Sequence, residues 1–453
     1  MAKSAEDTAA QPSTGPFESV SRALGGLYEA RAGGVLKRRW GAKEAEAFRA
    51  AMAPALAPID ARFGRVMEKG RRIRTQPSDE ALMRAAARAL AELERAGAVD
   101  GLRDEAAALA VLTFYVGDFK EALHWVNLAA RLDPDEPRNK LNGAVLSAEF
   151  LDFPLALRLA GEVLLKSSDL KEAWAVKARA LQGLRLAEDS RAAALEKAGD
   201  LKGARALRRK AEGRLDDARS ALREVVRIDP SDPLAFYELG KFDFTHGRLR
   251  EAAEAYGRAV ALDPTMKLAW YQKAAAHQMR EEVDAALGAF MAGLALEPRE
   301  ASGVHFKVAA MLALKGEKDK AFEWIASGLA LNKPNFYAEI YRIEFASLWG
   351  DPRWDALIEA FFADTGFKHT KVAQAEVGFS WGLFEHGSVL FYDSLADAFS
   401  AAEAFRREGD VAKAREYYEK LVVLLDREGH SLKAGVVRRR LESLPSASGP
   451  EAA

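Results

Sequence analysis

Residues 233–264 read PLAFYELGKFDFTHGRLREAAEAYGRAVALDP. Small residues, Gly240 and Ala252, stand where two short amphipathic helices would cross. The larger Leu239 and Tyr256 stand where they would fill the space around that crossing. The stretch therefore predicts a pair of packed helices.

The same pattern recurs along the chain at a fixed interval. Pro230, Pro264 and Pro298 are 34 residues apart, and each ends an Ala-rich amphipathic stretch. Self-similarity at such a period indicates a repeat array in which neighbouring units bury a continuous core. The abundance of Ala, Leu, Glu, Arg and Lys favours helix throughout.

With these features the sequence resembles the tetratricopeptide repeat family, in which 34-residue pairs of antiparallel helices stack into a right-handed superhelix. Residues at that family's characteristic places are Phe236, Leu239, Gly240, Ala252, Tyr256, Ala259 and Pro264. Further units are readable at 103–134, 137–168, 267–298, 301–333 and 395–426. The resemblance implies an all-α, right-handed tetratricopeptide superhelix.

One unit is longer than the others. After Trp174 and Ala178, the next expected small residue is Ala218, which is a delay of 28 residues. Fourteen residues added to each helix make nearly four whole turns, so both apolar faces keep their direction. We therefore expect an elongated hairpin over 171–228 that turns at Gly199 and Asp200. Its outer part, 185–214, carries a net charge of +4, typical of a solvated surface or of a docking site for an acidic partner.

The remaining chain is expected to divide as follows. Residues 1–16 and 445–453 read as disordered tails, and 17–102 as an N-terminal helical cap in which glycines and the prolines Pro54 and Pro58 break short helices. The array covers 103–363, a non-repeat aromatic insert covers 364–394, and a C-terminal unit with a capping helix covers 395–444. Within the insert, Val377–Phe384 and Val389–Tyr392 are expected to pair as a strand hairpin or to form a buried loop.

Composition and charge exclude several function classes. The 453 residues carry 66 Lys and Arg against 67 Asp and Glu, which opposes a dedicated nucleic-acid binder. Basic clusters at 37–39 and 69–74 leave contact with a membrane surface or RNA as an alternative to capping. The absence of cysteine excludes disulfides, thiolate metal sites and cysteine nucleophiles.

Targeting and membrane signals are also missing from the sequence. The first sixteen residues contain no apolar stretch of a secretory signal, so we expect a cytoplasmic protein. The longest uncharged apolar run, Ala106–Gly117, has 12 residues, fewer than the roughly 18 to 20 that span a bilayer. We therefore expect no transmembrane segment.

The sequence contains no recognisable catalytic or cofactor-binding motif. The seven histidines include no HExxH, and no phosphate-binding GxxxxGK[ST] or GxSxG elbow occurs. We therefore expect no enzyme, no catalytic residue, no metal site and no cofactor.

What remains is protein binding. In the tetratricopeptide family, contacts with partners come from an inner stripe of the first helix of each unit. The resemblance implies that the partner-binding groove here is formed by Phe114, Tyr115, Asn142, Arg179, Tyr237, Lys241, Phe244, Tyr271, Gln272, Met279, His305 and Phe306. A family subgroup clamps chaperone tails, but Ala107, Val111, Glu172 and Val176 occupy all clamp places here except that of Asn142.

The sequence thus predicts a non-catalytic scaffold or adaptor that binds a peptide or helix of another protein in the concave groove. Two alternatives stay open. One is a self-assembling scaffold, a homo-oligomer that associates through solenoid ends and convex faces. The other is a ligand sensor or enzyme centred on the aromatic residues of 365–394.

Overall fold

The computed structural model describes residues 16–32, 40–68, 73–296, 302–332, 336, 339, 342–365 and 389–445. Every regular element in these ranges is helical, which confirms the all-α prediction. The chain divides into two compact units, Met1–Asp229 and Pro230–Ala453. This division falls inside the array that the sequence predicts at 103–363.

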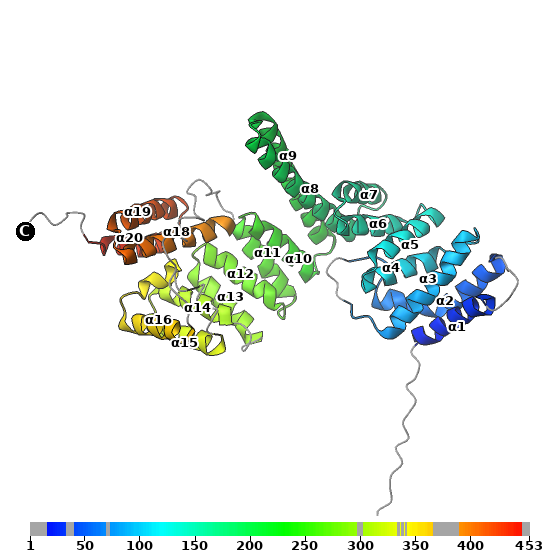
Figure 1. Ribbon diagram of the computed structural model, residues 1–453, viewed down its shortest axis with the longest axis horizontal. Coiled ribbons are helices and arrows are strands. Elements are labelled where there is room, and N and C mark those ends of the chain that lie inside the picture. The colour runs from blue at the N-terminus through cyan, green and yellow to red at the C-terminus, as the bar shows by residue number, and fades with distance from the viewer. Residues whose placement is uncertain are drawn as a thin grey trace, which may run out of the picture. The chain divides into compact units, whose positions relative to one another are not determined.

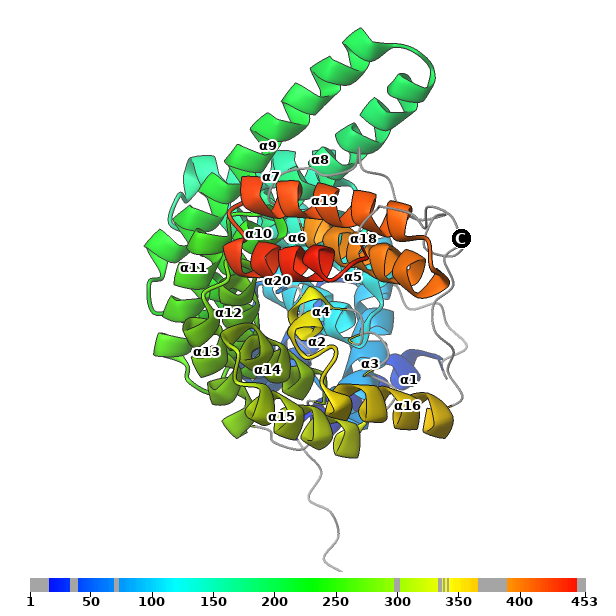
Figure 2. The same ribbon diagram turned by 90° about the vertical axis from the view of Figure 1, so that its left-hand side faces the viewer.

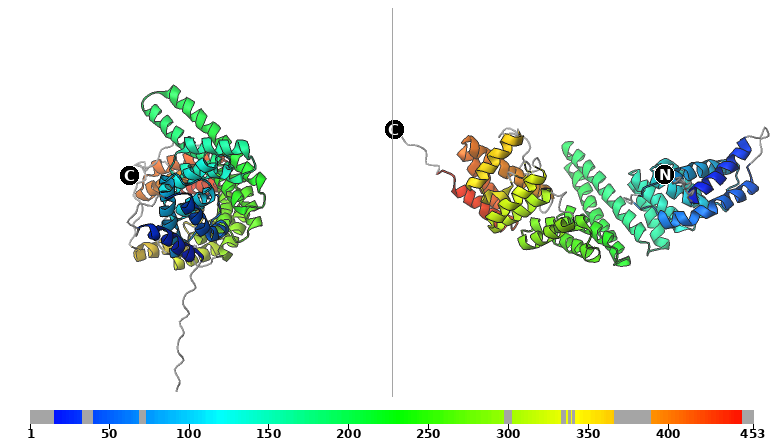
Figure 3. Two further views of the ribbon diagram at one scale, coloured as in Figure 1. Left: turned by 90° about the vertical axis from the view of Figure 1, so that its right-hand side faces the viewer. Right: turned by 90° about the horizontal axis from the view of Figure 1, so that it is seen from below.

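Unit 1 begins with three helices, α1 (Pro16–Ala32), α2 (Ala42–Arg62) and α3 (Pro77–Arg95). Helix α1 packs on α2 and α3, and both of these contact the next helix, α4 (Figures 1 and 3). Arg62 forms an ion pair of 2.8 Å with the fully buried Asp79, which joins the end of α2 to the start of α3.

The prediction that glycines and prolines break short helices is wrong at Gly25, Gly26, Pro54 and Pro58, because α1 continues through both glycines and α2 continues through both prolines. Each proline removes one backbone hydrogen bond, which normally destabilises a helix interior. Here Pro54 is exposed and Pro58 is half-buried, whereas Met52 and Ile59 of the same helix are fully buried. Packing of the buried face therefore outweighs the local preference of proline.

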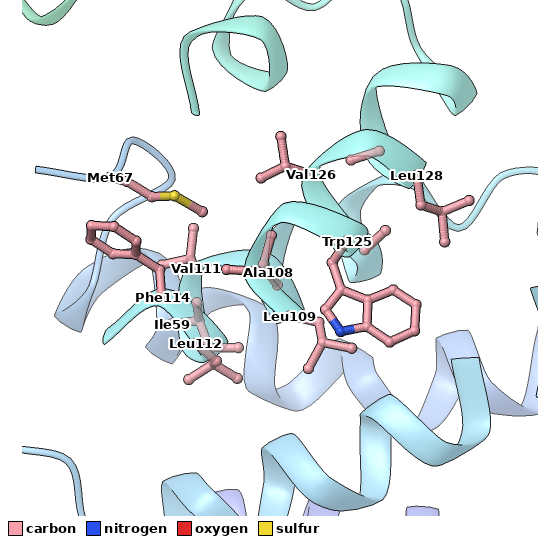
Figure 4. Close-up of a cluster of buried hydrophobic side chains, with 14 of the residues drawn as sticks. Ile59, Met67, Ala108, Leu109, Val111, Leu112, Phe114, Trp125, Val126 and Leu128 are labelled. Atoms are coloured by element: carbon pink, nitrogen blue, oxygen red, sulfur yellow. The ribbon is translucent and has the colours of Figure 1, made fainter. Parts of the chain in front are cut away.

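Three hairpins follow in unit 1 at a regular interval. Their first helices begin at Arg103, Pro137 and Lys171, 34 residues apart. Leu109 of α4 and Trp125 of α5 belong to the buried hydrophobic cluster of this unit (Figure 4). The helices are α4 (Arg103–Val116), α5 (Phe119–Leu132), α6 (Pro137–Glu149), α7 (Phe153–Lys166), α8 (Lys171–Lys197) and α9 (Leu201–Ile228).

The elongated hairpin is confirmed. Helices α8 and α9 have 27 and 28 residues, which corresponds to about 40 Å each, and their far ends extend past α6 and α7 (Figures 1 and 2). In the extension the buried Glu188 of α8 pairs with Arg214 at 2.8 Å and Lys210 at 3.0 Å on α9. These contacts join the two helices beyond the rest of the unit.

Unit 2 starts with three further hairpins and continues with a 3₁₀ helix and four more helices in the described residues. Gly240 of α10 lies under the ring of Tyr256 on α11, where an added Cβ atom would stand 2.9 Å from the ring, so this crossing requires glycine as predicted. The helices of unit 2 are α10 (Pro233–Thr245), α11 (Leu249–Leu262), α12 (Lys267–Met279), α13 (Val283–Leu296), α14 (Ser302–Lys315), α15 (Lys318–Leu331), the 3₁₀ helix η2 (Ile343–Ser347), α16 (Pro352–Thr365), α18 (Val389–Glu408), α19 (Val411–Arg427) and α20 (Ser431–Glu442).

The last three helices of unit 2 form a bundle (Figure 2). Glu403 of α18 is buried and accepts hydrogen bonds from Tyr418 of α19 and from Arg440 of α20. One carboxylate therefore joins all three helices. Helix α20 also packs on η2, which connects the bundle to the preceding hairpins.

The proposed strand or loop at Val389–Tyr392 is wrong, because these residues form the first turn of α18. No glycine or proline separates them from the Ala-rich stretch that ends at Glu408, so the helix extends back to Val389. The rest of the predicted insert, 366–388, lies outside the described residues. So do residues 1–15 and 446–453 of the predicted tails and most of the two N-terminal basic clusters.

Candidate protein-binding surfaces

The predicted groove residues fall into two sets. Those on α4, α6 and α8 are called here the unit 1 stripe: Phe114, Tyr115, Asn142 and Arg179. Those on α10, α12 and α14 are called the unit 2 stripe: Tyr237, Lys241, Phe244, Tyr271, Gln272, Met279, His305 and Phe306.

The unit 1 stripe contacts a segment of the chain itself. Residues 63–68 follow α2, and the side chain of Asn142 binds their backbone at two points. Its Nδ2 donates to the carbonyl of Arg65 at 2.8 Å, and its Oδ1 accepts from the amide of Met67 at 2.9 Å. Asn142 is only 2% exposed, so both of its polar groups are used inside the fold.

Side chains on either side of this contact pack against the same helices. The ring of Phe63 lies 5.7 Å from that of Tyr115, whose hydroxyl accepts a long hydrogen bond of 3.4 Å from the amide of Glu68. Met67 is 1% exposed and belongs to the buried cluster that also contains Phe114 (Figure 4). Three of the four predicted residues of unit 1 are therefore covered by or packed beneath the chain's own residues.

Charge complements these contacts. The guanidinium of Arg65 pairs with Asp60 of α2 at 2.7 Å and with Asp104 of α4 at 2.9 Å. The hydrogen bond to Asp60 and the charges of both carboxylates raise the pKa of Arg65 despite partial burial. A small open cavity lies beside this pair, and its lining is polar: Arg65, Arg103, Asp104, Ala107, Glu136, Arg138 and Asn139.

Arg179, the fourth residue of the unit 1 stripe, joins two hairpins. Its guanidinium forms an ion pair with Glu149 at the end of α6, and both side chains are about one-fifth exposed. Arg179 is thus engaged between α6 and α8.

The unit 2 stripe is most accessible on α10. The side chain of Lys241 is 60% exposed and forms a loose ion pair of 3.6 Å with Glu238 one turn away. Tyr237 and Phe244 are half-buried, and both pack on the small cluster that includes Tyr256. Their exposed parts and the ammonium group of Lys241 share one helix face because they stand three or four residues apart.

The stripe residues are more buried on α12 and α14 than on α10. Gln272 and Met279 of α12 are half-buried. The ring of Tyr271 lies over Gly293 of α13, where an added Cβ would come within 2.4 Å of it.

On α14 both predicted residues are buried. Phe306 is 0% exposed, and its ring lies 5.0 Å from that of Phe336. The ring of His305 lies 5.1 Å from that of Trp324. These two residues are therefore inaccessible in the folded chain, because helix packing uses their aromatic faces.

Sequence reasoning missed one residue that organises unit 2. The carboxylate of Glu281, in the turn between α12 and α13, accepts from the amides of Leu432 at 2.8 Å and Lys433 at 3.1 Å. It thereby caps the N-terminus of α20 from outside that helix. A sequence signal was present, because Glu281 stands 34 residues after the turn glycine Gly247. In the structure Glu281 has φ +56°, the left-handed conformation that glycine adopts in five other hairpin turns: Gly117, Gly199, Gly247, Gly316 and Gly409.

Charged groups surround this cap. The Glu344 carboxylate lies 3.7 Å from the Lys433 ammonium group and 3.3 Å from the Arg342 guanidinium. Burial acts to raise the pKa of Glu344, but the charges of Arg342 and Lys433 outweigh it and hold the pKa at about 2. Burial, together with the charge of Lys433, lowers the pKa of His430 to about 4.

The described residues show neither a metal-ligand cluster nor a membrane span. No group of three or more metal-ligating side chains is gathered in those parts of the chain. None of the helices that the structure describes has the length and apolar character to cross a bilayer.

No family model and no curated protein matches the chain. Solved structures with similar folds include YrrB, titled a TPR protein with an unusual peptide-binding site, at 16% identity and a TM-score of 0.37 over 47% of this chain and 96% of that one. A second is PilF of Pseudomonas aeruginosa, with 16% identity and a TM-score of 0.37 over 52% and 97% of the two chains. A third is a thermophilic TPR protein of Thermus thermophilus, with 18% identity and a TM-score of 0.33 over 46% and 98%.

Because these TM-scores are below 0.5, the assignment of the fold rests on the chain's own geometry. First helices begin 34 residues apart at Arg103, Pro137 and Lys171, and again at Pro233 and Lys267. Each packs most extensively on the helix that follows it. By these hairpins and their interval, the chain has the architecture of the tetratricopeptide repeat family.

Proposed function

We propose that this chain is a non-catalytic protein-interaction scaffold in which the accessible part of the unit 2 stripe, on α10 and α12, binds a segment of a partner protein. The observation that carries the proposal is the contact in unit 1. There, side chains of the first helices hold a non-helical segment by its backbone, and its apolar side chains Phe63 and Met67 are buried. The same helix positions on α10 and α12 are partly exposed.

The chemistry of the accessible part favours a particular kind of segment. Tyr237 and Phe244 offer aromatic surface, and Lys241 offers a cation that is 60% exposed. Aromatic side chains are enriched among the residues that dominate binding energy. A segment with apolar side chains and an acidic residue complements this surface, and its association should weaken as salt concentration rises.

The experiment starts by identifying the partner. A photo-reactive phenylalanine analogue placed at Phe244 should cross-link the partner in cell extract, and mass spectrometry should locate the linked segment. Affinity for the purified partner is then measured by calorimetry for the wild-type chain and for Tyr237→Ala with Lys241→Ala. We expect the double variant to lose at least about tenfold in affinity, or about 1.4 kcal/mol.

Arg250→Ala is the matched control, because Arg250 is a well-exposed cation on the second helix of the same hairpin. It should leave affinity unchanged. Equal affinities of the double variant and the wild type would contradict the proposal. Cross-linking of position 244 to other copies of this chain would instead support the self-assembling alternative.

A further inference from the structure

Segment 63–68 occupies the unit 1 stripe in the manner of a bound peptide. It is held by side chains of α4 and α6, and neither of these helices is adjacent to it in sequence. Its Phe63 and Met67 are fully buried, while the backbone between them is bound by Asn142. The contact therefore joins residues about 75 positions apart in the chain.

The contacts define what this surface recognises. Asn142 binds the carbonyl of one residue and the amide of the second residue after it, and the backbone bends between them. Asp104 binds the arginine Arg65. The apolar cluster around Phe114 accommodates the long unbranched side chain of Met67, two positions after that arginine. Recognition thus requires a segment that can adopt this bent backbone, with arginine at one position and methionine, or a similar apolar residue, at the second position after it.

The occupant is bonded to its own helix α2 at its start, where the amides of Phe63 and Gly64 donate to carbonyls at the end of α2 and Arg65 pairs with Asp60. Residues 63–68 are fixed on α4 and α6 chiefly by the two bonds to Asn142, the ion pair with Asp104, the long bond to Tyr115 and apolar packing. The polar cavity beside Arg65 also leaves part of the surface unfilled. A segment supplied by another protein can therefore make each of these contacts and add more within the cavity.

We propose that the unit 1 stripe is a second binding surface, which segment 63–68 closes in cis and which a partner segment of the same Arg-x-Met chemistry opens by replacing it. This goes beyond the function proposed for unit 2 and does not depend on it. A tethered occupant has an effective concentration of the order of millimolar. The partner segment must therefore exceed the cis segment in contacts to displace it.

The test uses the full chain and a fluorescent peptide with the sequence of residues 60–68, DARFGRVME, followed by fluorescence anisotropy. In one chain variant, Arg65→Glu with Met67→Asp, the cis segment is repelled by Asp104 and excluded from the apolar cluster. We expect this variant to bind the peptide at least about tenfold more tightly than the wild type, because the tethered competitor is gone. Equal affinities would overturn the proposal.

Two further measurements secure the result. Adding Asn142→Ala to the double variant should abolish the gained affinity, and a peptide that itself carries Arg65→Glu and Met67→Asp should not bind. If the double variant fails to melt cooperatively, Met67→Ala is used instead, since it keeps the ion pair with Asp104. It should still bind the unchanged peptide several-fold more tightly than the wild type does, and no gain would again overturn the proposal.

Discussion

The two stripes hold equivalent places on their hairpins but meet different surroundings. In unit 1, Asn142 is 2% exposed because residues 63–68 cover it, whereas Gln272, at the same place on α12 of unit 2, is half-buried. The repeat pattern sets which helix face a residue occupies. Segments outside the repeat decide whether that face is free, which teaches that groove residues cannot be assigned from helix position alone.

The largest expected effect separates core from surface within unit 2. Phe306→Ala should destabilise this unit by about 3–5 kcal/mol, because it leaves a cavity beside Phe336. Tyr237→Ala, on the half-buried part of the same stripe, should cost about 1 kcal/mol. Urea unfolding, monitored by hydrogen exchange in peptides of each unit, measures both. Similar costs for the two variants would place Phe306 on the surface instead.

Acid should lower the stability of unit 2, because His430 is protonated more readily in the unfolded chain than in the fold. The pKa of His430 is lowered to about 4 in the fold, against 6.5 as the ordinary value. The unfolded chain therefore binds a proton first, so stability is complete above pH 6.5 and falls by about 3 kcal/mol as the pH drops towards 4. Glu344, with a pKa of about 2 against 4.5, adds a loss in the same direction below pH 4.5.

His430→Gln tests this prediction, since glutamine does not titrate. Between pH 6.5 and 4 the variant should lose less stability than the wild type, as measured by the urea midpoint of unit 2. His124→Gln is the control, because His124 is about half-exposed and lies in unit 1. If His430→Gln keeps the full pH dependence of the wild type, the buried neutral imidazole is not its cause.

A smaller effect contrasts the two stripes directly. Asn142→Ala should destabilise unit 1 by about 1–3 kcal/mol, because the carbonyl of Arg65 and the amide of Met67 lose their partner in a buried place. Gln272→Ala, on the half-buried stripe of α12, should change stability by less than about 0.5 kcal/mol. Denaturation resolved by unit compares them, and equal small changes would mean that the Asn142 contact contributes little.

The smallest effect concerns two hairpin turns in which a residue other than glycine has a left-handed backbone. Leu151 has φ +61° and is 68% exposed, so Leu151→Gly should stabilise unit 1 by about 1 kcal/mol. Glu281→Gly relieves the same strain in unit 2 but removes the cap of α20, so it should be destabilising. Thermal midpoints of the two variants should therefore move in opposite directions, and movement in the same direction would refute the role of Glu281.

Much of the fold was predictable because its signal is local and periodic. The spacing of prolines and small residues located the hairpins, and the 28-residue delay before Ala218 gave the elongated pair α8 and α9. The turn between these helices could be placed at Gly199 and Asp200, which stand midway along the hairpin in the sequence. The errors at Pro54 and Val389 arose where tertiary packing or helix extension overrode local signals.

The candidate surfaces were less predictable because they depend on contacts between distant residues. Nothing near Asn142 in the sequence indicates that the carbonyl of Arg65 would bind it, nor that Phe336 would cover Phe306. Glu281 was detectable as an exception among the turn glycines, although its contact with α20 was not. The repeat pattern predicts on which helix or turn each residue lies. Only the folded structure shows which distant residues contact it.

Residues 63–68 cover Asn142 and contact Tyr115 of the unit 1 stripe in the folded chain. Amide hydrogen exchange at Met67 tests this arrangement most directly, because this amide donates to Asn142 from a segment outside any helix. We predict slow exchange in the wild-type chain and fast exchange in Asn142→Ala. Exchange at the rate of a free peptide in the intact wild-type chain would contradict this arrangement.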